Sequence, residues 1–264
     1  MVDIIIRAKN GHDLTAACVA SIRRNTPKDS YRIILVDDGS DPPLDAPVDY
    51  LIRSAASQGA VSATNLGLAV SLTKHDSAYV MVMDNDTEIP EGDEGWLDRF
   101  VKELEQYGPK TAAVGATTNF AMAPQHILHT PKTYQADWKD ERAKTSGVKE
   151  NPPVIWFISF SVLLRKDVVR QVGPWDERFN PGNWEDTDYA VQLRTAGYDV
   201  RVARSVYIHH HGHRTFGAQL NDLLATNEQK FVDKWGPGRL FDLGLLTADT
   251  MDRLIKATTG GNRG

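Results

Sequence analysis

The sequence has a single cysteine, no long apolar run and no excess of positive charge. Cys18 has no partner for an intramolecular disulfide, which fits a reducing compartment such as the cytoplasm. No apolar run approaches the roughly 20 residues that a transmembrane helix needs, and no basic segment followed by a long apolar one opens the chain, so we expect no signal peptide. The net charge of −5 disfavours a dedicated nucleic-acid binder, because such proteins cluster Lys and Arg. These absences favour a cytoplasmic protein.

What the sequence does have is an alternation of β-rich and helical patterns through its first half. Its 264 residues, 41% of them hydrophobic and 25% charged, are ordinary for a soluble globular protein and suffice for a substantial core. The expected elements alternate in this order: strand 3–8, helix 14–25, strands 31–38 and 48–54, helix 60–73, strand 78–84, helix 94–107 and strand 111–117. The alternation predicts an α/β fold with a mainly parallel sheet that helices cover on both faces.

The second half is less regular. Residues 119–153 are polar, contain proline and show no periodicity, so we expect an extended loop or lid there. The remaining expected features are an apolar run at 154–166, a helix at 184–198, short strands at 199–203 and 205–209, and an amphipathic helix at 218–235. No internal repeat or low-complexity segment divides the chain, which predicts one α/β domain over residues 1–264.

The fourth expected strand ends abruptly in Asp84, Asn85 and Asp86. Ligands of open α/β sheets bind beyond the carboxyl ends of the strands. Because side chains alternate along an extended chain, Asp84 and Asp86 should lie on one side, with Asn85 opposite. Two carboxylates on one side suit Mg²⁺ or Mn²⁺ bound to phosphate oxygens, although a polar turn after a strand would use the same residues. An EF-hand calcium loop fails on spacing, because Ile89 and Gly95 stand where it needs Gly and Glu.

Two other polar stretches belong to the same edge of the expected sheet. Asp37 and Asp38 end the second strand, where a carboxylate can accept from a nucleotide base or a ribose hydroxyl, or can cap its own turn. Gly59, Asn65 and Gly67 punctuate the entrance of the next helix. Glycine there allows either close approach of a ligand or tight helix–strand packing. The edge thus carries candidates for nucleotide contacts as well as for a metal.

Several motifs follow one another along the chain: "VDIIIRAKN", "ILVDDGSD", "QGAVSATNLG", "VMVMDNDTEIP", "GPWDERFNPGNWEDTDYAVQLRTAGYDV" and "SVYIHHHGH". Together they resemble the family 2 glycosyltransferases, nucleotide-sugar-dependent enzymes with the GT-A fold, over roughly residues 2–236. The most specific piece is the block around "WEDTDYAVQLRTAGY". The resemblance implies a single Rossmann-like GT-A domain, in which about residues 1–110 bind the nucleotide sugar, about 111–236 bind the acceptor, and 237–264 form a tail.

The resemblance assigns roles to the residues at the edge of the sheet. In the family, the Asp-x-Asp motif binds the divalent cation, Mn²⁺ or Mg²⁺, that holds the diphosphate of the nucleotide sugar, which implies that role for Asp84 and Asp86. UDP is the favoured carrier from the habits of the family. The residues expected to contact the donor are Arg7, Asp38, Gly59, Asn65, Asp84, Asn85 and Arg214.

The stretch "NWEDTDYAVQLRTAGY" opens an expected helix with acidic residues. Asn183 suits the N-cap, and Asp186 follows three residues later, near the positive end of the helix dipole. Stabilisation of the helix would by itself explain these acids. In the resembling family, however, the second acid of this Glu-Asp pair is the general base of an inverting transfer. That implies a catalytic role for Asp186, with Glu185 beside it as an acceptor contact or a supporting group.

Histidines gather in "SVYIHHHGHRTF" as His209, His210, His211 and His213. A surface cluster without a role is one explanation. GT-A enzymes often complete the metal site with a His after the last short strand. Counting without gaps from Gly197 favours His210 as this ligand, while the alternating pattern leaves His211 open and makes His209 the weakest of the three.

The chain also departs from the family pattern. The first loop after a strand, Arg7–Asn10, lacks the small or hydroxyl residue and the aromatic that the family usually has there. Thr64 stands where many members carry Arg, and Phe157 and Phe160 occupy a segment that small residues usually line. The resemblance therefore implies the reaction class rather than the nucleotide base or the sugar.

Two other functions compete with the inverting glycosyltransferase. A sugar nucleotidyltransferase would share the sheet and the metal carboxylates, but it would want a Gly-rich, basic loop after the first strand, of which "RAKNGHDLT" is a poor version. A catalytically inactive nucleotide-sugar-binding protein of the same fold is the other alternative. The acceptor hydroxyl could belong to a glycan, a protein, a small molecule or a modified nucleic-acid base.

Overall fold

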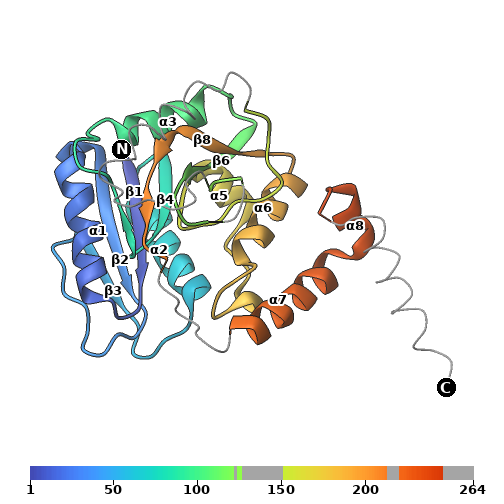
Figure 1. Ribbon diagram of the computed structural model, residues 1–264, viewed down its shortest axis with the longest axis horizontal. Helices are drawn as coiled ribbons and strands as arrows, with labels where there is room; N and C mark the ends of the chain where they lie inside the picture. The colour runs from blue at the N-terminus through green and yellow to red at the C-terminus, as the bar shows by residue number, and fades with distance from the viewer. Residues whose placement is uncertain (122–123, 127–150, 213–219, 246–264) are drawn as a thin grey trace. The chain divides into compact units, whose positions relative to one another are not determined.

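The computed structural model describes residues 1–121, 124–126, 151–212 and 220–245 (Figure 1). The chain divides into two compact units, Met1–Arg214 and Thr215–Gly264. Most of the loop expected at 119–153 lies outside the described residues, and so do the predicted donor contact Arg214 and the neighbouring His213.

A seven-stranded sheet forms the centre of the first unit. Its strands are β1 (Val2–Ala8), β2 (Tyr31–Asp37), β3 (Tyr50–Arg53), β4 (Tyr79–Asp84), β6 (Thr111–Thr117), β7 (Ser161–Arg165) and β8 (Asp199–Tyr207). They lie in the order β3-β2-β1-β4-β7-β6-β8. Within this sheet β7 runs antiparallel to β4 and β6, and the other pairings are parallel. The expected mainly parallel α/β sheet is confirmed.

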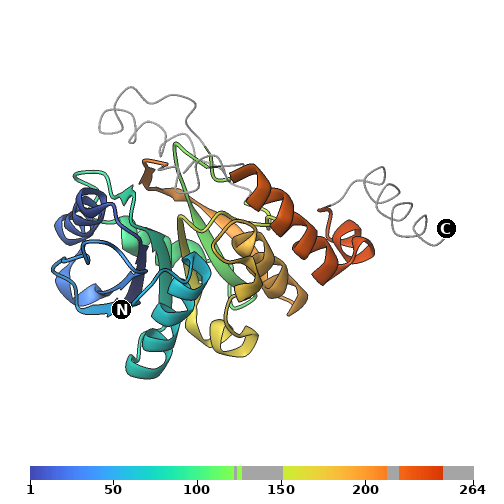
Figure 2. The same cartoon turned by 90° about the horizontal axis from the view of Figure 1, so that it is seen from below.

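Helices cover both faces of this sheet (Figure 2). They are α1 (His12–Asn25), α2 (Ala60–Lys74), α3 (Trp96–Glu105), α5 (Lys166–Val172) and α6 (Glu185–Thr195), with short 3₁₀ helices at Lys28–Ser30 and Glu177–Phe179. Within the apolar run expected at 154–166, only Ser161–Arg165 forms a strand, β7. The next residue, Lys166, begins α5.

Strand β1 shows how the two layers of helices are held. Ile4, Ile5 and Ile6 are all fully buried, as expected for a strand that is covered on both faces. Ile4 and Ile6 share a core with Cys18 of α1, whereas Ile5 packs toward α2. A Cβ at Gly67 of α2 would lie 2.4 Å from Cγ2 of Ile5. Helix–strand packing therefore explains this glycine.

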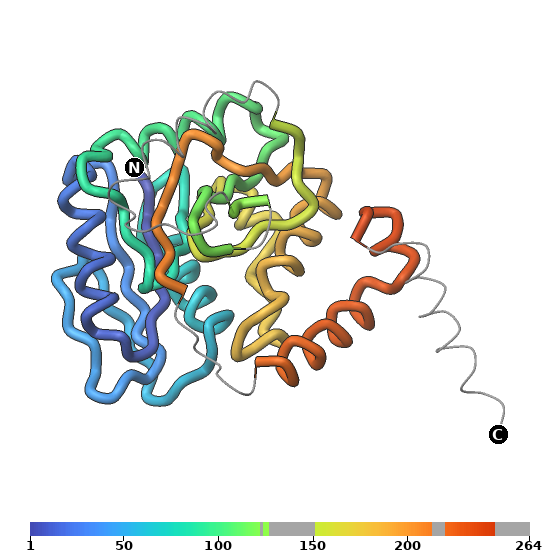
Figure 3. The backbone as a smooth tube through the Cα atoms, in the orientation of Figure 1, coloured from blue at the N-terminus to red at the C-terminus, as the bar shows by residue number. Residues whose placement is uncertain are grey.

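A small second sheet pairs β5 (Thr87–Glu88) with β9 (His209–His210). In its antiparallel register Thr87 lies opposite His210 and Glu88 opposite His209. The expectation of separate strands at 199–203 and 205–209 is wrong, because β8 continues to Tyr207 through a shift of register beside β6. Figure 3 traces the chain from β8 into β9, which brings the histidines back to the end of β4.

The second unit is described from residue 220 to 245 and contains α7 (Leu220–Trp235) and α8 (Pro237–Asp242). The helix expected at 218–235 corresponds to α7. Every helix among the described residues is too short or too polar to cross a lipid bilayer.

Candidate active site at the carboxyl ends of β1 and β4

Two carboxylates and an imidazole meet where β4 ends. Asp84, Asp86 and His210 each offer one ligand atom, and these atoms lie within 4.8 Å of one another. The pairing of β5 with β9 explains the proximity, because it places His210 opposite Thr87, directly after Asp86. The N–H of His211 also donates to the carbonyl of Asp86 at 2.9 Å. Carboxylate oxygens and an imidazole nitrogen are ligand types that bind divalent cations.

The ring of His210 is held in one orientation. Its Nδ1 donates to the carbonyl of Phe120 at 2.7 Å, which aims Nε2 at Asp86 Oδ1, 3.2 Å away. The backbone N–H of His210 donates to Asn119 Oδ1 at 2.9 Å, and the ring stacks on Phe160 at a centroid distance of 5.2 Å. Burial alone would lower the pKa of His210. The carboxylate of Asp86 outweighs burial, so the pKa of His210 is raised. A metal-binding His commonly has a carbonyl partner of this kind on its other ring nitrogen.

The two neighbouring histidines point to other partners. Nε2 of His211 lies 2.8 Å from Oε1 of Glu88. Nδ1 of His209 lies 3.3 Å from the hydroxyl of Tyr207, and burial, together with His211, lowers the pKa of His209 to about 4. Among the described residues, neither belongs to the group formed by the two aspartates and His210.

Asn85 lies on the opposite side of the chain from the two aspartates. Its Nδ2 donates to Thr15 Oγ1 at 2.9 Å and to the carbonyl of Asn10 at 3.4 Å. The amide thereby joins the end of β4 to the start of α1. Contact with the donor stays a prediction for Asn85.

Arg7, the second-last residue of β1, lies beside the metal candidates and is buried. Its Nε is 2.6 Å from Asp84 Oδ1, and its Nη1 is 3.7 Å from Glu185 Oε1. Burial would lower the pKa of the guanidinium, but Asp84 and Glu185 outweigh it and raise the pKa. Arg7 is thus a fixed positive charge between acids from two different parts of the chain.

The acids Glu185 and Asp186 open helix α6. The expectation that Asn183 caps this helix is wrong: Trp184 takes the cap position without a side-chain cap. Asn183 and Trp184 have φ values of 70° and 71°, a left-handed conformation that is uncommon outside glycine and is concentrated at functional sites. Asp186 accepts hydrogen bonds from the backbone N–H of Thr187 at 2.7 Å and from that of Ser159 at 3.2 Å.

Both of these carboxyl groups are buried, at 6% and 8% exposure for Glu185 and Asp186. Oε2 of Glu185 accepts no hydrogen bond from the described residues. Burial, and then the charge of Asp186, raises the pKa of Glu185. Burial likewise raises the pKa of Asp186, despite its hydrogen bonds and the nearby charge of Arg7. Acids in such surroundings are typical of catalytic sites.

The other predicted donor contacts are engaged within the protein. Asp38 accepts from Ser57 Oγ at 2.7 Å, from the N–H of Gln58 at 2.7 Å and from the N–H of Gly59 at 2.9 Å. A Cβ at Gly59, whose φ is +101°, would lie 2.4 Å from Asn180 Oδ1, so glycine is needed for packing there.

Two further polar side chains from the expected edge are also tied to backbone groups. Asn65 donates to the carbonyl of Trp175 at 2.9 Å and accepts from its N–H at 3.0 Å. Asp37 caps its own turn by accepting from the N–H groups of Ser40 and Leu44. For Asp38, Gly59 and Asn65, contact with a donor stays a prediction.

Several residues that complete the site carry no recognisable signal in the sequence. Ser159 contacts both Arg7 and Asp186, yet in the sequence it is one of two serines in an apolar run and has no neighbouring motif. Asn119 and Phe120 orient His210 from some 90 positions away along the chain, and no local pattern marks them.

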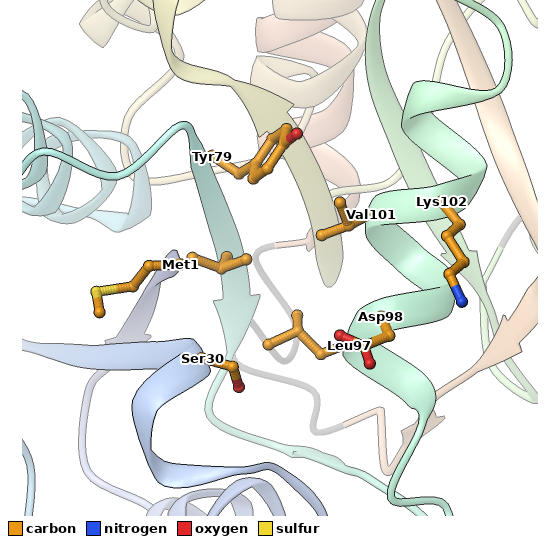
Figure 4. A pocket seen from close by; sticks show the side chains of 8 residues that line it. Met1, Ser30, Tyr79, Leu97, Asp98, Val101 and Lys102 are labelled. Atoms are coloured by element: carbon orange, nitrogen blue, oxygen red, sulfur yellow. The ribbon is translucent and has the colours of Figure 1, made fainter.

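The amino ends of the strands offer a different kind of surface. A cavity of about 210 Å³ lies there, lined mainly by Met1, Tyr79, Leu97 and Val101 (Figure 4). None of the predicted site residues lines it. Asp84, Asp86 and His210, with Glu185 near them, lie instead at the opposite, carboxyl end of the sheet.

The order of the motifs and the acidic edge of the sheet agree with a comparison of sequences. Residues 3–173 match the family described as Glycosyl transferase family 2. The chain belongs to this family. No curated protein sequence matches this glycosyltransferase.

Solved structures are similar to this glycosyltransferase in fold. The crystal structure of GalNAc-T7 with UDP, GalNAc and Mn²⁺ has a TM-score of 0.64 at 13% identity, over 89% of this chain and 48% of GalNAc-T7. The mannosyltransferase PcManGT from Pyrobaculum calidifontis, in complex with GDP-Man and Mn²⁺, has a TM-score of 0.61 at 15% identity, over 100% of this chain and 76% of its own. The crystal structure of S. aureus TarS 1–349 has a TM-score of 0.56 at 13% identity, over 97% and 78%. The chain thus spans about half the length of GalNAc-T7. The fold is the GT-A fold of glycosyltransferases.

Proposed function

We propose that this glycosyltransferase moves a sugar from a nucleotide-sugar donor to an acceptor hydroxyl, with inversion at the anomeric carbon and with Mn²⁺ or Mg²⁺ at the donor diphosphate. The observation that carries the proposal is the meeting of Asp84, Asp86 and His210 beside the buried acids Glu185 and Asp186, with Arg7 between the two groups. Family membership supports sugar transfer over nucleotidyl transfer.

The residues at the end of β4 fit a divalent cation. Their ligand atoms are close together, and the ring of His210 is fixed by its hydrogen bond to Phe120. Asp84, Asp86 and His210 would hold the cation. When bound, it would offset the negative charge that develops on the leaving diphosphate. His211 is the less favoured ligand because its ring is paired with Glu88.

Asp186 is the proposed general base, with Glu185 beside it on the acceptor side. Asp186 takes the proton of the acceptor hydroxyl while the hydroxyl oxygen bonds to the anomeric carbon. The bond from that carbon to the diphosphate breaks, and the nucleoside diphosphate leaves with the electron pair. The backbone N–H groups of Ser159 and Thr187 fix the orientation of the carboxylate.

For the donor we favour a UDP-sugar, with the nucleotide over the carboxyl ends of β1, β2 and β4. Asp38, Gly59, Asn65 and Asn85 would lie near it, although their side chains or backbone also bind protein groups. Acceptors that fit the proposal are a hydroxyl of a glycan, a protein, a small molecule or a modified nucleic-acid base. A cytoplasmic location stays a prediction from the cysteine content.

Release of UDP from UDP-sugars, measured with Mn²⁺ and again with EDTA, tests the proposal, with GDP-sugars as the alternative donors. We expect turnover that EDTA abolishes, and a product whose anomeric configuration is inverted by NMR. Retention of configuration would overturn the role of Asp186. Binding of a nucleotide sugar without any turnover would favour the inactive binding protein.

A further inference from the structure

The guanidinium of Arg7 contacts four parts of the fold at once. Its Nε donates to Oδ1 of Asp84, at the end of β4, at 2.6 Å. Its Nη1 donates to Thr64 Oγ1 of α2 at 3.3 Å and lies 3.7 Å from Glu185 Oε1 of α6. Its Nη2 donates to Ser159 Oγ, in the segment before β7, at 2.7 Å. The side chain is 8% exposed, so protein groups take up the guanidinium almost entirely.

Ser159 carries this set of contacts on to the proposed base. Its hydroxyl accepts from Arg7, and its backbone N–H donates to Asp186 Oδ2 at 3.2 Å. One line of contacts therefore runs from Asp84 through Arg7 and Ser159 to Asp186. It joins the donor side of the proposed site to the acceptor side.

We propose that Arg7 is a positioning residue that fixes Asp84 for the divalent cation and, through Glu185 and Ser159, fixes the start of α6 for the proposed base. The inference rests on the proposed metal-dependent transfer. It replaces direct contact with the nucleotide as the main role of Arg7. By holding Oδ1 of Asp84, the guanidinium fixes the orientation of the carboxylate that would bind the cation.

Packing alone does not explain this arginine. Exchange of a buried ion pair for apolar side chains of similar volume is often neutral or stabilising, so stability gives little reason for a buried charge here. The planar guanidinium can donate in three fixed directions at once, to Asp84, Thr64 and Ser159. A lysine at this position would keep the charge but could not hold all three partners.

Titration of the whole protein with Mn²⁺ alone separates positioning from simple charge. Removal of a positive charge next to the carboxylates would by itself tighten Mn²⁺ binding, because like charges repel. Loss of the orientation of Asp84 would weaken Mn²⁺ binding instead. We therefore expect Arg7→Met to weaken Mn²⁺ binding by about 10- to 100-fold, the usual cost of removing a group that orients a metal ligand. Arg7→Lys should bind no better than Arg7→Met, because it keeps the repulsion and loses the directed hydrogen bonds.

Arg165→Met is the matched control. Arg165 is a mostly buried arginine of β7 that donates to Glu105 and to the carbonyl of Thr111, at the opposite end of the sheet. This variant should lose stability and keep its Mn²⁺ affinity. Thermal unfolding establishes that each variant is folded, and Arg7→Lys serves if Arg7→Met does not fold.

Two outcomes would overturn the inference, and they are distinguishable. If the unsubstituted protein binds Mn²⁺ and the Arg7 variants bind it equally or more tightly, Arg7 does not position the site, and the proposed function stands. If the unsubstituted protein binds no Mn²⁺, the proposed metal-dependent function fails and the inference fails with it.

Discussion

Strand β1 carries a buried charged residue near each end, and the surroundings of the two differ. At the amino end, Oδ2 of Asp3 accepts hydrogen bonds from Ser71, Ser77 and Lys166. Burial would raise the pKa of Asp3, but these three donors outweigh it and lower the pKa. The acid of this cluster is matched by a buried cation and by hydroxyl donors.

At the carboxyl end of β1, the buried residue is a cation and its charged neighbours are acids. Arg7 is the buried cation, and the acids around it are Asp84, Glu185 and Asp186. The pKa values of Glu185 and Asp186 are raised by burial, whereas the pKa of Asp3 is lowered. At the amino end, a buried carboxylate is paired with a cation and hydroxyl donors, which is typical of a structural role. At the carboxyl end, the buried acids outnumber the buried cation, which is typical of a functional site that binds a cation or a proton.

The largest expected effect comes from removing a metal candidate at the carboxyl end. Asp86→Ala and Asp84→Ala should abolish metal-dependent donor binding. Asp84→Ala should also lower stability, because it removes the closest partner of the buried Arg7. Asp86 should matter more, because Asp84 is shared with Arg7 while Asp86 faces His210. Calorimetric titration with UDP and Mn²⁺ measures this. Asp98→Ala, at the exposed amino end, is the control, and full donor binding by Asp86→Ala would contradict the site.

The next largest effect concerns the proposed base. Asp186→Asn keeps the size of the side chain but cannot take a proton, so transfer should fall by about 10²- to 10⁴-fold. Donor binding should survive, since Asp186 acts on the acceptor hydroxyl. Steady-state rates at saturating donor, set beside a donor titration, give both quantities. A loss of donor affinity as large as the loss of rate would place Asp186 on the wrong side of the reaction.

The third effect separates the two adjacent histidines. His210→Ala should weaken Mn²⁺ binding by about 10- to 100-fold, because its ring faces Asp86 and is fixed by Phe120. His211→Ala should change it much less, because that ring is paired with Glu88. Electron paramagnetic resonance of free Mn²⁺ measures both affinities. The reverse order would move the ligand by one residue.

Local patterns predicted much of the fold and the proximity of Asp84 to Asp86. The alternation of side chains after a buried strand sufficed to put Asp84 and Asp86 together with Asn85 opposite, because it depends on neighbouring residues alone. The same holds for the strands and helices of the first half, whose apolar periods are unambiguous. The antiparallel place of β7 between β4 and β6 depends on the path of the chain and has no local signal.

Long-range pairing accounts for what the sequence could not show. The partners of Arg7 stand 57 and 152 positions away at Thr64 and Ser159, so no spacing rule connects them. Asp38 illustrates the opposite difficulty: an acid at a strand end looks like a ligand contact, yet its oxygens hold the backbone of the loop before α2. Asn183 was expected to cap α6 by its residue type, but the helix begins at Glu185 and Trp184 takes the cap position.

A smaller effect tests whether the surplus of acids destabilises the carboxyl end. Glu185 faces Arg7 from β1, Asp84 from β4 and its neighbour Asp186, and its pKa is raised in the folded state. The folded protein therefore binds this proton more tightly than the unfolded chain, and stability should fall as the pH rises above about 4.5, the ordinary value for Glu. Glu185→Gln should remove that loss, with a gain of about 1.4 kcal/mol for each pKa unit of the shift.

Urea unfolding in EDTA at acid and alkaline pH measures this gain, which should be absent at low pH. Glu105→Gln at the amino end is the matched control. Arg165 and Tyr79 lower the pKa of Glu105 despite its partial burial, so the stability from Glu105 is present above its ordinary pKa and is lost as the pH falls. The effect of each substitution on the free energy of unfolding should change with pH in opposite directions for the two variants. The same direction for both would refute the contrast between the two ends of the sheet.

The smallest effect on the proposed reaction should follow from the amino-end cluster. Lys166→Met removes the buried cation of Asp3 and leaves Arg32, 3.7 Å from Oδ1, so it should cost at most about 3–5 kcal/mol of unfolding free energy. Mn²⁺ affinity at the folded site should not change, because Lys166 pairs with the start of β1 and Asp84 lies at the far end of β4. The double variant Asp3→Asn with Lys166→Met should recover part of the stability, since it removes both charges together. Urea unfolding and Mn²⁺ titration of the same samples check both statements. If Lys166→Met weakened Mn²⁺ binding as much as Arg7→Met, the two ends of β1 would act as one network, and the contrast between a balanced and a surplus cluster would fail.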